Sequence, residues 1–227
     1  MDAWIVSHEP TGQVRRALRE AGLRLSRARP DVVFSLGGDG TLLEAEAAFP
    51  GVPKVPLRDR GVFSPAPCYH PRQAARIAQL IAAGRYRVRE WGKVEAAAAG
   101  RRLLALNEIQ VRSQNPSRAL RFTLTVDGKA STVIGDGIVA ATAFGSTGYY
   151  RSIGNRPFSR GVRVGFNNVY PRRPPQAFAR CRLRIERELA WVFADTATRV
   201  ALRPGQQVTI RPSKEKARFV IFQGVRR

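Results

Sequence analysis

The sequence is poor in the residues that build disulfide frameworks and zinc sites. It contains two cysteines, Cys68 and Cys181, and two histidines among 227 residues. Cysteines this far apart provide neither the paired spacing of a zinc site nor a disulfide framework. The sequence therefore predicts a fold held together by an ordinary apolar core.

Long apolar runs are also missing. No stretch approaches the roughly 20 apolar residues that span a bilayer. The segment Met1–Trp4 lacks the basic region and apolar core of a signal peptide. An apolar fraction of 44% and an aromatic fraction of 8% are ordinary for a globular domain. We expect a cytoplasmic protein without a membrane partner, folded as one large domain or two small ones.

Acidic residues are scarce: 17 Asp and Glu face 39 Lys and Arg, which gives a net charge of +22. Of the basic residues 34 are arginines, dispersed along the chain without a long basic block. Such a charge suits a polyanionic substrate or a nucleic acid, but it also suits a GC-rich genome that favours Arg codons. No recognition-helix or aromatic-platform motif supports nucleic-acid binding, so the charge is consistent with an acidic substrate without selecting one.

The first 85 residues alternate between strand and helix patterns. Apolar stretches predict strands, and apolar residues at helical spacing predict helices. The expected elements are strands at residues 3–6, 32–36 and 51–57 and helices at residues 13–21, 42–48 and 71–83. This alternation is typical of an α/β layer with a parallel sheet, which binds ligands at the carboxyl ends of its strands.

From residue 86 onward the patterns are those of strands. The Asp127-Gly128 pair between alternating segments predicts a β-hairpin. The expected hairpins pair residues 94–96 with 103–106, 122–126 with 130–134, and 200–202 with 208–210. Residues 219–222 form a further strand without an assigned partner. The expected fold is an α/β domain with a parallel sheet at residues 1–85, followed by a β-rich domain at residues 86–227.

A glycine turn at Gly37–Thr41, with the sequence Gly-Gly-Asp-Gly-Thr, separates the second strand from its helix. Glycines let backbone N–H groups approach a ligand closely, and a helix N-terminus attracts anions. The turn therefore predicts a phosphate site, with a purely structural turn as the alternative. It is not a P-loop, because the G-x-x-x-x-G-K-[ST] pattern is absent. A carboxylate here, Asp39, suggests a metal ion or a hydroxyl to deprotonate.

Two weaker blocks follow. Asn107-Glu108 stands at a strand end, where a carboxamide and a carboxylate suit ribose hydroxyls and a base edge, although, taken alone, an ordinary strand-end turn explains them better. Gly135-Asp136-Gly137 leads into a second glycine- and hydroxyl-rich turn, Gly145–Tyr149. There we expect Ser146 to cap a short helix that carries Tyr149 and Ser152.

Taken in this order, the three blocks resemble the NAD kinases. The resemblance implies an α/β domain, then a β-rich domain whose last strand returns to the first. It also implies an enzyme that transfers a phosphoryl group from ATP, or from polyphosphate, to the 2′-hydroxyl of the adenosine ribose of NAD. A divalent ion such as Mg²⁺ and a homodimer or homotetramer are part of the same expectation.

Residue roles follow from the same resemblance. Asp39 becomes the catalytic residue at the accepting hydroxyl. The expected phosphate-binding residues are Gly37, Gly38, Gly40 and Thr41. The expected NAD-binding residues are Asn107 and Glu108, which hold the adenosine portion, and Asp136, Thr147, Gly148, Tyr149 and Ser152, with Asp136 reaching the site from a neighbouring subunit. No metal ligand is assigned.

Alternatives remain open. The chain is also consistent with a nucleotide-binding regulator of the same fold with weakened catalysis. A lipid kinase of the diacylglycerol or sphingosine type would share the Gly37–Thr41 motif but not the later blocks. The Gly-Ile-Asn and Leu-Gly-Phe segment of the family is replaced here by residues 56–63, where only Gly61 and a displaced aromatic residue, Phe63, are similar to it. The phosphoryl donor, the preference for NAD or NADH and the oligomer size stay undetermined.

Overall fold

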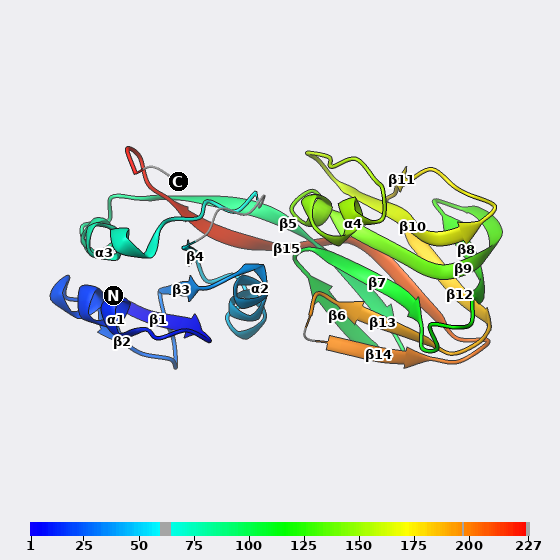
Figure 1. The fold of residues 1–227 in the computed structure, drawn as a ribbon, viewed down its shortest axis with the longest axis horizontal. Helices are drawn as coiled ribbons and strands as arrows, with labels where there is room; N and C mark the ends of the chain where they lie inside the picture. The colour runs from blue at the N-terminus through cyan, green and yellow to red at the C-terminus, as the bar shows by residue number, and fades with distance from the viewer. Residues whose placement is uncertain (60–64, 197, 226–227) are drawn as a thin grey trace. The chain divides into compact units, whose positions relative to one another are not determined.

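The computed structural model describes residues 1–59, 65–196 and 198–225, and the chain divides into two compact units (Figure 1). Unit 1 comprises Met1–Trp91 and Lys216–Arg227, and unit 2 comprises Gly92–Glu215. The sequence-based domain boundaries, residues 1–85 and 86–227, describe segments expected to fold independently. They stay a prediction.

Unit 1 is built on a parallel sheet with the strand order β4-β3-β1-β2. Its strands are β1 (Asp2–Ser7), β2 (Arg24–Leu25), β3 (Val32–Leu36) and β4 (Lys54–Leu57). Its helices are α1 (Gly12–Glu20), α2 (Asp39–Ala48), the 3₁₀ helix η1 (Pro71–Gln73) and α3 (Ala74–Ala82). Every residue of β3 and β4 is buried, as expected of parallel strands covered on both faces.

The helices bury the apolar positions that the sequence pattern predicts. In α1 these are Val14, Ala17 and Leu18, and in α3 they include Ile77 and Ile81. They belong to one core cluster with strand residues of unit 1. The fully buried ion pair of Lys54 with Glu46 joins the start of β4 to α2. This contact fixes the helix that follows the glycine turn.

Unit 2 consists almost entirely of antiparallel strands. They are β5 (Arg87–Ala98), β6 (Arg101–Ala105), β7 (Glu108–Ser113), β8 (Leu120–Val126), β9 (Lys129–Thr142), β10 (Val162–Tyr170), β11 (Gln176–Ala177), β12 (Cys181–Arg187), β13 (Ala190–Ala194), β14 (Thr198–Leu202) and β15 (Gln207–Ile221). Two short helices follow β9, the 3₁₀ helix η2 (Gly145–Thr147) and α4 (Tyr149–Ser152). Strands β5 and β15 begin in one unit and end in the other.

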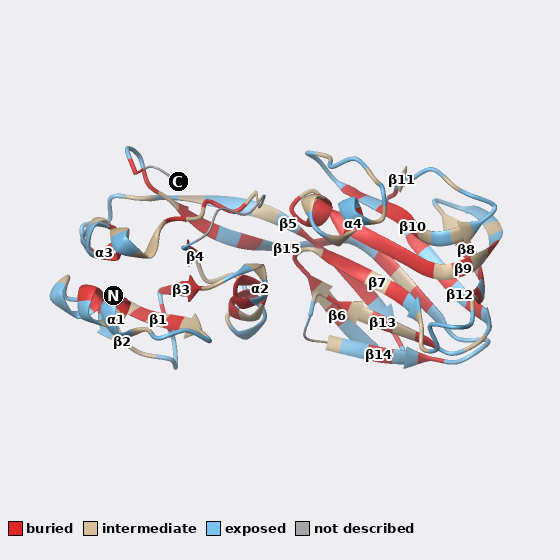
Figure 2. Ribbon diagram, viewed as in Figure 1, coloured by how far each residue is buried: buried red, intermediate tan, exposed pale blue. Residues whose placement is uncertain are grey.

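Alternation builds the core of unit 2. In β12, Cys181, Leu183 and Ile185 are buried, and the residues between them are exposed (Figure 2). The Asp127-Gly128 hairpin forms as predicted and joins β8 to β9. Residues 219–222 find their partner in unit 1, where Phe219 of β15 pairs in parallel with Lys54. The expected fold class is confirmed, with parallel strands and helices in the first part and a β-rich second part.

The predicted hairpin between residues 200–202 and 208–210 is wrong. Strand β14 pairs with β13, where Trp191 lies opposite Ala201, and Val208 of β15 pairs with Leu183 of β12. Gly205 N–H donates to Ile185 O at 2.8 Å, so the turn is tied to β12. Strand β14 instead pairs with β13, the strand just before it in the chain, and β15 pairs with β12, so the Pro204-Gly205 turn joins two strands that do not pair with each other.

Among the helices of the described residues, none combines the length and the apolar character that crossing a bilayer requires.

Candidate active site

The glycine turn of unit 1 joins the carboxyl end of β3 to the start of α2, as the sequence predicts. Gly37 has a φ of +139°, and a Cβ there would lie 2.6 Å from Thr41 Oγ1, so only glycine fits. Gly38 is the N-cap, and Asp39 is the first helical residue. Phosphate-binding geometry needs free N–H groups, and the first turn of a helix supplies them. Gly37, Gly38, Gly40 and Thr41 are thus brought together at one helix N-terminus.

The Asp39 carboxylate is paired with an arginine that the sequence did not single out. Arg58, directly after β4, donates from Nη2 to Asp39 Oδ1 at 2.5 Å. The Asp39 side chain is 45% exposed, whereas that of Arg58 is 6% exposed. Residues 60–64 of the divergent segment, including Gly61 and Phe63, lie outside the described residues.

In unit 2, the turn at Asn107 is held from both sides. The Asp195 carboxylate accepts the backbone N–H groups of Leu106, Asn107 and Glu108 at 2.7, 2.9 and 3.2 Å. Thr142 Oγ1 donates to Leu106 O at 2.6 Å, and Thr142 N–H donates to Asn107 O at 2.9 Å. The backbone of the Asn-Glu pair is therefore rigid. Within the described residues the Asn107 carboxamide has no hydrogen-bond partner, which leaves it available to a ligand.

The Asn-Glu block meets the Gly-Ser-Thr-Gly-Tyr block at this turn. Gly145 N–H donates to Thr142 Oγ1 at 3.0 Å. A Cβ on Gly145 would lie 2.3 Å from Asn107 O, so the approach requires glycine. Two motifs that are far apart in the chain thus share one place in unit 2.

Glu108 is a buried acid with one oxygen unsatisfied. Its Oε1 accepts from Gln110 Nε2 at 3.1 Å, and its Oε2 is buried without a hydrogen-bond partner among the described residues. Desolvation, with the nearby Asp195 charge, raises the pKa of Glu108 to about 7. The pKa of Asp195 is raised to about 6 by desolvation, against which its three amide bonds and Lys93 act. The pair favours an ionised Asp195 beside a Glu108 that still holds a proton near neutral pH.

The remaining predicted NAD-binding residues, apart from Asp136, lie on η2 and α4 or between them. Tyr149 Oη accepts from Asn167 Nδ2 at 3.2 Å, and the Arg112 guanidinium lies 5.7 Å from the Tyr149 ring centroid. Ser152 Oγ donates to Tyr149 O at 2.8 Å. Thr147 ends η2, and Gly148 is the N-cap of α4. Four of the predicted residues therefore form one short stretch of surface after β9.

The expected cap by Ser146 is wrong. Gly148, whose side chain offers no acceptor, precedes α4. Ser146 Oγ donates instead towards Ala143 O at 2.8 Å and Phe158 O at 3.1 Å. The serine lies within η2, two residues before the N-cap of α4, and its hydrogen bond to Phe158 O ties the turn to a later loop.

Asp136 lies on β9 between Gly135 and Gly137. Its Oδ2 accepts from Asn168 Nδ2 at 3.2 Å. A Cβ on Gly137 would lie 1.8 Å from Val111 O, so the glycine permits close pairing of β9 with β7. The contribution of Asp136 to a neighbouring subunit stays a prediction.

Within residues 1–59, 65–196 and 198–225, no three His, Cys, Asp or Glu side chains gather as a metal-binding group. Asp39 is the one carboxylate of the glycine turn. Mg²⁺ retains waters and is commonly held by one or two carboxylates together with substrate phosphates. The residues present fit an ion that arrives with the phosphoryl donor.

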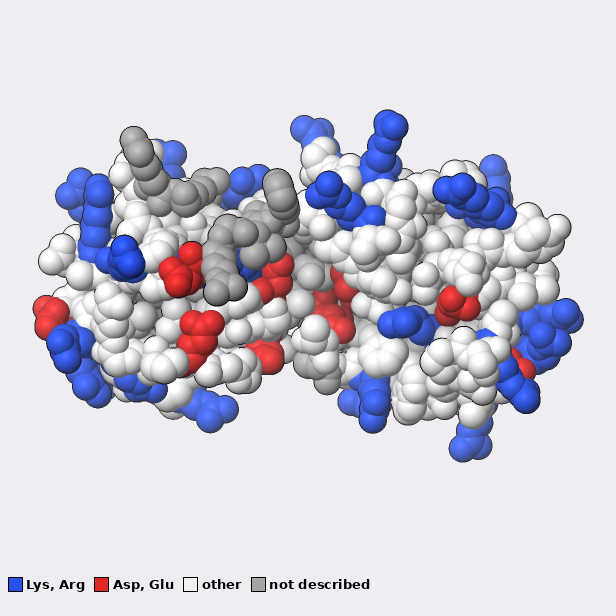
Figure 3. All heavy atoms as spheres, in the orientation of Figure 1, with Lys and Arg blue, Asp and Glu red and all other residues white. Residues whose placement is uncertain are grey.

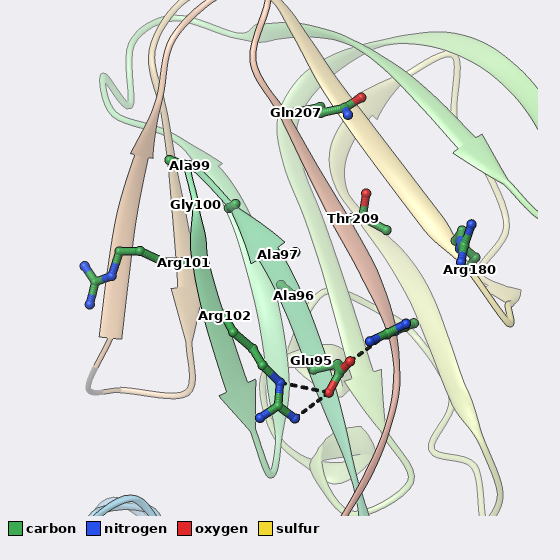
Figure 4. Close-up of a pocket in the computed structure, with 12 residues that line it drawn as sticks. Glu95, Ala96, Ala97, Ala99, Gly100, Arg101, Arg102, Arg180, Gln207 and Thr209 are labelled. Atoms are coloured by element: carbon green, nitrogen blue, oxygen red, sulfur yellow. Dashed lines mark hydrogen bonds and ion pairs between the residues drawn. The ribbon is translucent and has the colours of Figure 1, made fainter.

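A cavity of about 550 Å³ on unit 2 contains none of the predicted residues (Figure 4). Glu95 accepts there from Arg102 Nη2 at 2.6 Å and from Arg211 Nε at 2.5 Å. Burial opposes ionisation, but these hydrogen bonds and one from Ser213 lower the pKa of Glu95 to about 2. Glu95 is thus paired with two arginines, while Arg101 and Arg180 also line the cavity.

Comparison with known proteins identifies the fold and the family. The model of the ATP-NAD kinase C-terminal domain matches residues 106–222. The NAD kinase of Thermoplasma acidophilum is 27% identical over 222 residues, which cover 93% of this chain and 81% of the relative. NAD kinase 1 of Halalkalibacterium halodurans is 32% identical over 165 residues, which cover 66% of this chain and 59% of the relative.

Two solved structures show the same fold. The NAD kinase of Archaeoglobus fulgidus in complex with ATP has a TM-score of 0.78 at 23% identity, covering 96% of this chain and 93% of that one. Yeast NADH kinase complexed with NADH has a TM-score of 0.83 at 16% identity, covering 98% and 84%. The architecture is thus the NAD kinase fold. The chain belongs to the NAD kinase family.

Proposed function

We propose that this enzyme transfers the γ-phosphoryl group of ATP to the 2′-hydroxyl of the adenosine ribose of NAD, giving NADP. The observation that carries the proposal is the Gly37–Thr41 turn, which presents one carboxylate, Asp39, among the free amides of a helix N-terminus. Family membership supports NAD as the acceptor, and the ATP in the structure of the Archaeoglobus fulgidus enzyme supports the choice of ATP as the donor in this proposal.

Each group of residues has a role in this reaction. Asp39 accepts the proton of the 2′-hydroxyl as its oxygen bonds to the γ-phosphorus, and the bond from that phosphorus to ADP breaks. The amides around Gly38 and Gly40 bind phosphate oxygens, together with Thr41. Asn107 and Glu108 bind the adenosine portion, and the surface from Thr147 to Ser152 binds the rest of the dinucleotide.

Charge neutralisation is the main demand of such a reaction. Phosphoryl transfer passes through a loose transition state, so catalysis consists mostly of positioning and of compensating negative charge. Mg²⁺ supplies part of that compensation when it is bound with the donor. The net charge of +22 attracts the anionic substrates.

The charge distribution favours a small anionic substrate over a nucleic acid. Lys and Arg side chains are dispersed over the visible face and form no single stripe (Figure 3). The family match covers residues 106–222, outside the Gly37–Thr41 motif, and this argues against a lipid kinase that shares that motif alone.

We further propose that the protein is cytoplasmic and forms a homodimer or homotetramer. In this assembly Asp136 reaches the NAD site of the neighbouring subunit.

One observation favours a second candidate, a nucleotide-binding regulator with weakened catalysis. Arg58 Nη2 donates a hydrogen bond to Asp39 Oδ1 at 2.5 Å. A carboxylate that is paired in this way is not free to accept a proton. For the enzyme, substrate binding has to displace this contact. For the regulator, the contact persists and NAD binds without turnover.

An NADP⁺-formation assay separates the two candidates. ATP and then polyphosphate are offered as donors, with and without Mg²⁺, while NAD binding is measured by calorimetry. The proposal expects NADP⁺ from ATP in the presence of Mg²⁺. Measurable NAD binding without product from either donor would favour the regulator.

A further inference from the structure

Arg58 stands where β4 ends beside the glycine turn. Leu57, the last residue of β4, is in register with Leu36, and its carbonyl accepts the Gly37 N–H at 3.0 Å. Arg58 N–H donates to Tyr69 O at 2.8 Å. The backbone of Arg58 is therefore fixed from both sides, directly against the turn that the phosphate-binding residues form.

The guanidinium reaches into the turn but uses only part of its hydrogen-bonding capacity. Nη2 donates to Asp39 Oδ1 at 2.5 Å, and Nε donates to Gly37 O at 3.4 Å. Nη1 is buried and has no hydrogen-bond partner among the described residues. A guanidinium carries five N–H donors in a rigid fork that matches carboxylate and phosphate oxygens. The buried donors of Nη1 are therefore left without the oxygen that this geometry suits.

Stability of the fold does not explain this arrangement. The Asp39 carboxylate is 45% exposed, so water can solvate it without a buried cation. An arginine that is 6% exposed gives up its hydration, and such a group normally finds partners for all of its donors. A buried Nη1 donor without a partner, beside the free N–H groups of a helix N-terminus, is typical of an anion-binding site.

The Gly37–Thr41 turn itself contains no cationic side chain that could contact phosphate oxygens. A P-loop has a lysine that contacts the phosphates, and the Gly37–Thr41 turn has none. Asp39 places a negative charge where phosphate oxygens have to bind, and that charge repels them. Arg58 is the buried cation in contact with this turn, and its fork suits phosphate oxygens better than a lysine does.

We propose that Arg58 is a phosphate-binding residue that contacts the transferring phosphoryl group during the reaction. In the free enzyme its guanidinium pairs with Asp39. When the acceptor hydroxyl engages Asp39, the guanidinium is released to donate to phosphate oxygens from Nη1 and Nη2. This inference rests on the proposed kinase function, and it adds a residue that occupies the divergent segment of this chain.

The direct test measures the binding of inorganic pyrophosphate by calorimetry in the presence of saturating NAD, so that the acceptor hydroxyl engages Asp39 while the absence of a phosphoryl donor prevents turnover. Arg58→Met keeps the apolar stem and removes the fork. Arg16→Met, on the exposed face of α1, removes the same charge elsewhere in unit 1. Loss of two charge-assisted hydrogen bonds should raise the dissociation constant about 10- to 100-fold in Arg58→Met. Arg16→Met should change it less than about twofold, which measures the general attraction of a +22 protein.

Equal pyrophosphate affinity in wild type and Arg58→Met would overturn the proposal. If Arg58→Met does not fold, Arg58→Lys replaces it, because it keeps the charge and loses the fork. The lysine variant should then bind pyrophosphate more weakly than wild type, and equal binding would again overturn the proposal.

Turnover distinguishes a phosphate contact from simple positioning of Asp39. With Arg58 on the phosphate, Arg58→Met raises KM for ATP and lowers kcat, while KM for NAD stays near the wild-type value. Guanidine at low millimolar concentration should partly restore turnover to Arg58→Ala. A loss of kcat with unchanged pyrophosphate binding and no rescue would make Arg58 a positioning residue and contradict the contact. Wild type that binds pyrophosphate through Arg58 but forms no NADP⁺ would refute the proposed function and leave the phosphate site intact.

Discussion

The Asp195 carboxylate accepts the backbone N–H of Asn107 at 2.9 Å, although 88 residues separate them in the chain. Asp195 follows β13 and has a φ of +49°, so a backbone of uncommon conformation places its side chain under the Asn-Glu turn. Because the same carboxylate also accepts the N–H groups of Leu106 and Glu108, one residue fixes the orientation of two predicted nucleotide-binding side chains.

Asp195→Asn should weaken NAD binding without touching the ligand. The amide replaces one accepting oxygen by an NH₂ group that faces backbone N–H donors, so the turn loses at least one hydrogen bond. We expect the free energy of unfolding to fall by about 1–3 kcal/mol and KM for NAD to rise more than kcat falls. Steady-state kinetics and urea unfolding measure the two effects.

Asp127 provides the matched control for that variant. It too has a positive φ, +45°, and its Oδ1 accepts the N–H groups of Ala179 and Arg180 at 3.0 and 2.8 Å. Asp127→Asn should lower stability to a similar extent and leave KM for NAD unchanged. Equal effects of both variants on KM would remove the positioning role of Asp195.

Glu108 should make stability depend on pH. Its pKa is raised from 4.5 to about 7 in the folded chain, so the folded state holds a proton that the unfolded state releases. Stability is then greatest below pH 4.5 and falls as pH rises to about 7, by at most about 3 kcal/mol. In Glu108→Gln most of this decrease in stability should be absent. The smaller decrease that remains, at lower pH, should come from Asp195. Urea unfolding of both proteins at intervals between pH 4.5 and 8 measures it, and parallel curves would contradict the raised pKa.

Gly145→Ala should disrupt the contact between the two unit 2 motifs. The added Cβ would lie 2.3 Å from Asn107 O, a backbone atom that cannot yield cheaply. We expect a lower melting temperature. We also expect KM for NAD to rise by a larger factor than kcat falls. Gly12→Ala, where a Cβ meets nothing within 4 Å, is the control and should retain wild-type values. A Gly145→Ala enzyme with wild-type KM would show that this close approach is not needed for binding.

Local signals in the sequence predicted the elements and turns whose partners are near in the chain. The Gly37–Thr41 turn between strand and helix and the Asp127-Gly128 hairpin are of this kind, because residue type alone sets their backbone geometry. Pairings that depend on distant strands were out of reach. The end of β15 pairs in parallel with β4, where Phe219 lies opposite Lys54, and no turn signal encodes that pairing.

In the candidate site, too, local sequence identifies some residues and folding alone brings in the others. The motif residues were found because their residue types are unusual at strand ends, yet the groups that hold them were not. Asp195 and Arg58 carry no motif of their own, and each acts only because folding brings it to a turn that is distant in sequence. Ser146 shows the converse, since a residue of the right type lies two positions before the N-cap of α4 and does not cap it.

The most direct test of the central claim is NADP⁺ formation by Asp39→Asn with ATP and Mg²⁺. Removing a general base should lower kcat by a factor of about 10²–10⁴, and the melting temperature should fall only slightly because the carboxamide oxygen can still accept from Arg58 Nη2. Asp31→Asn, which alters an exposed carboxylate elsewhere in unit 1, should keep wild-type kcat. Near-normal turnover by Asp39→Asn would contradict the account, because no carboxylate would then be needed at the glycine turn.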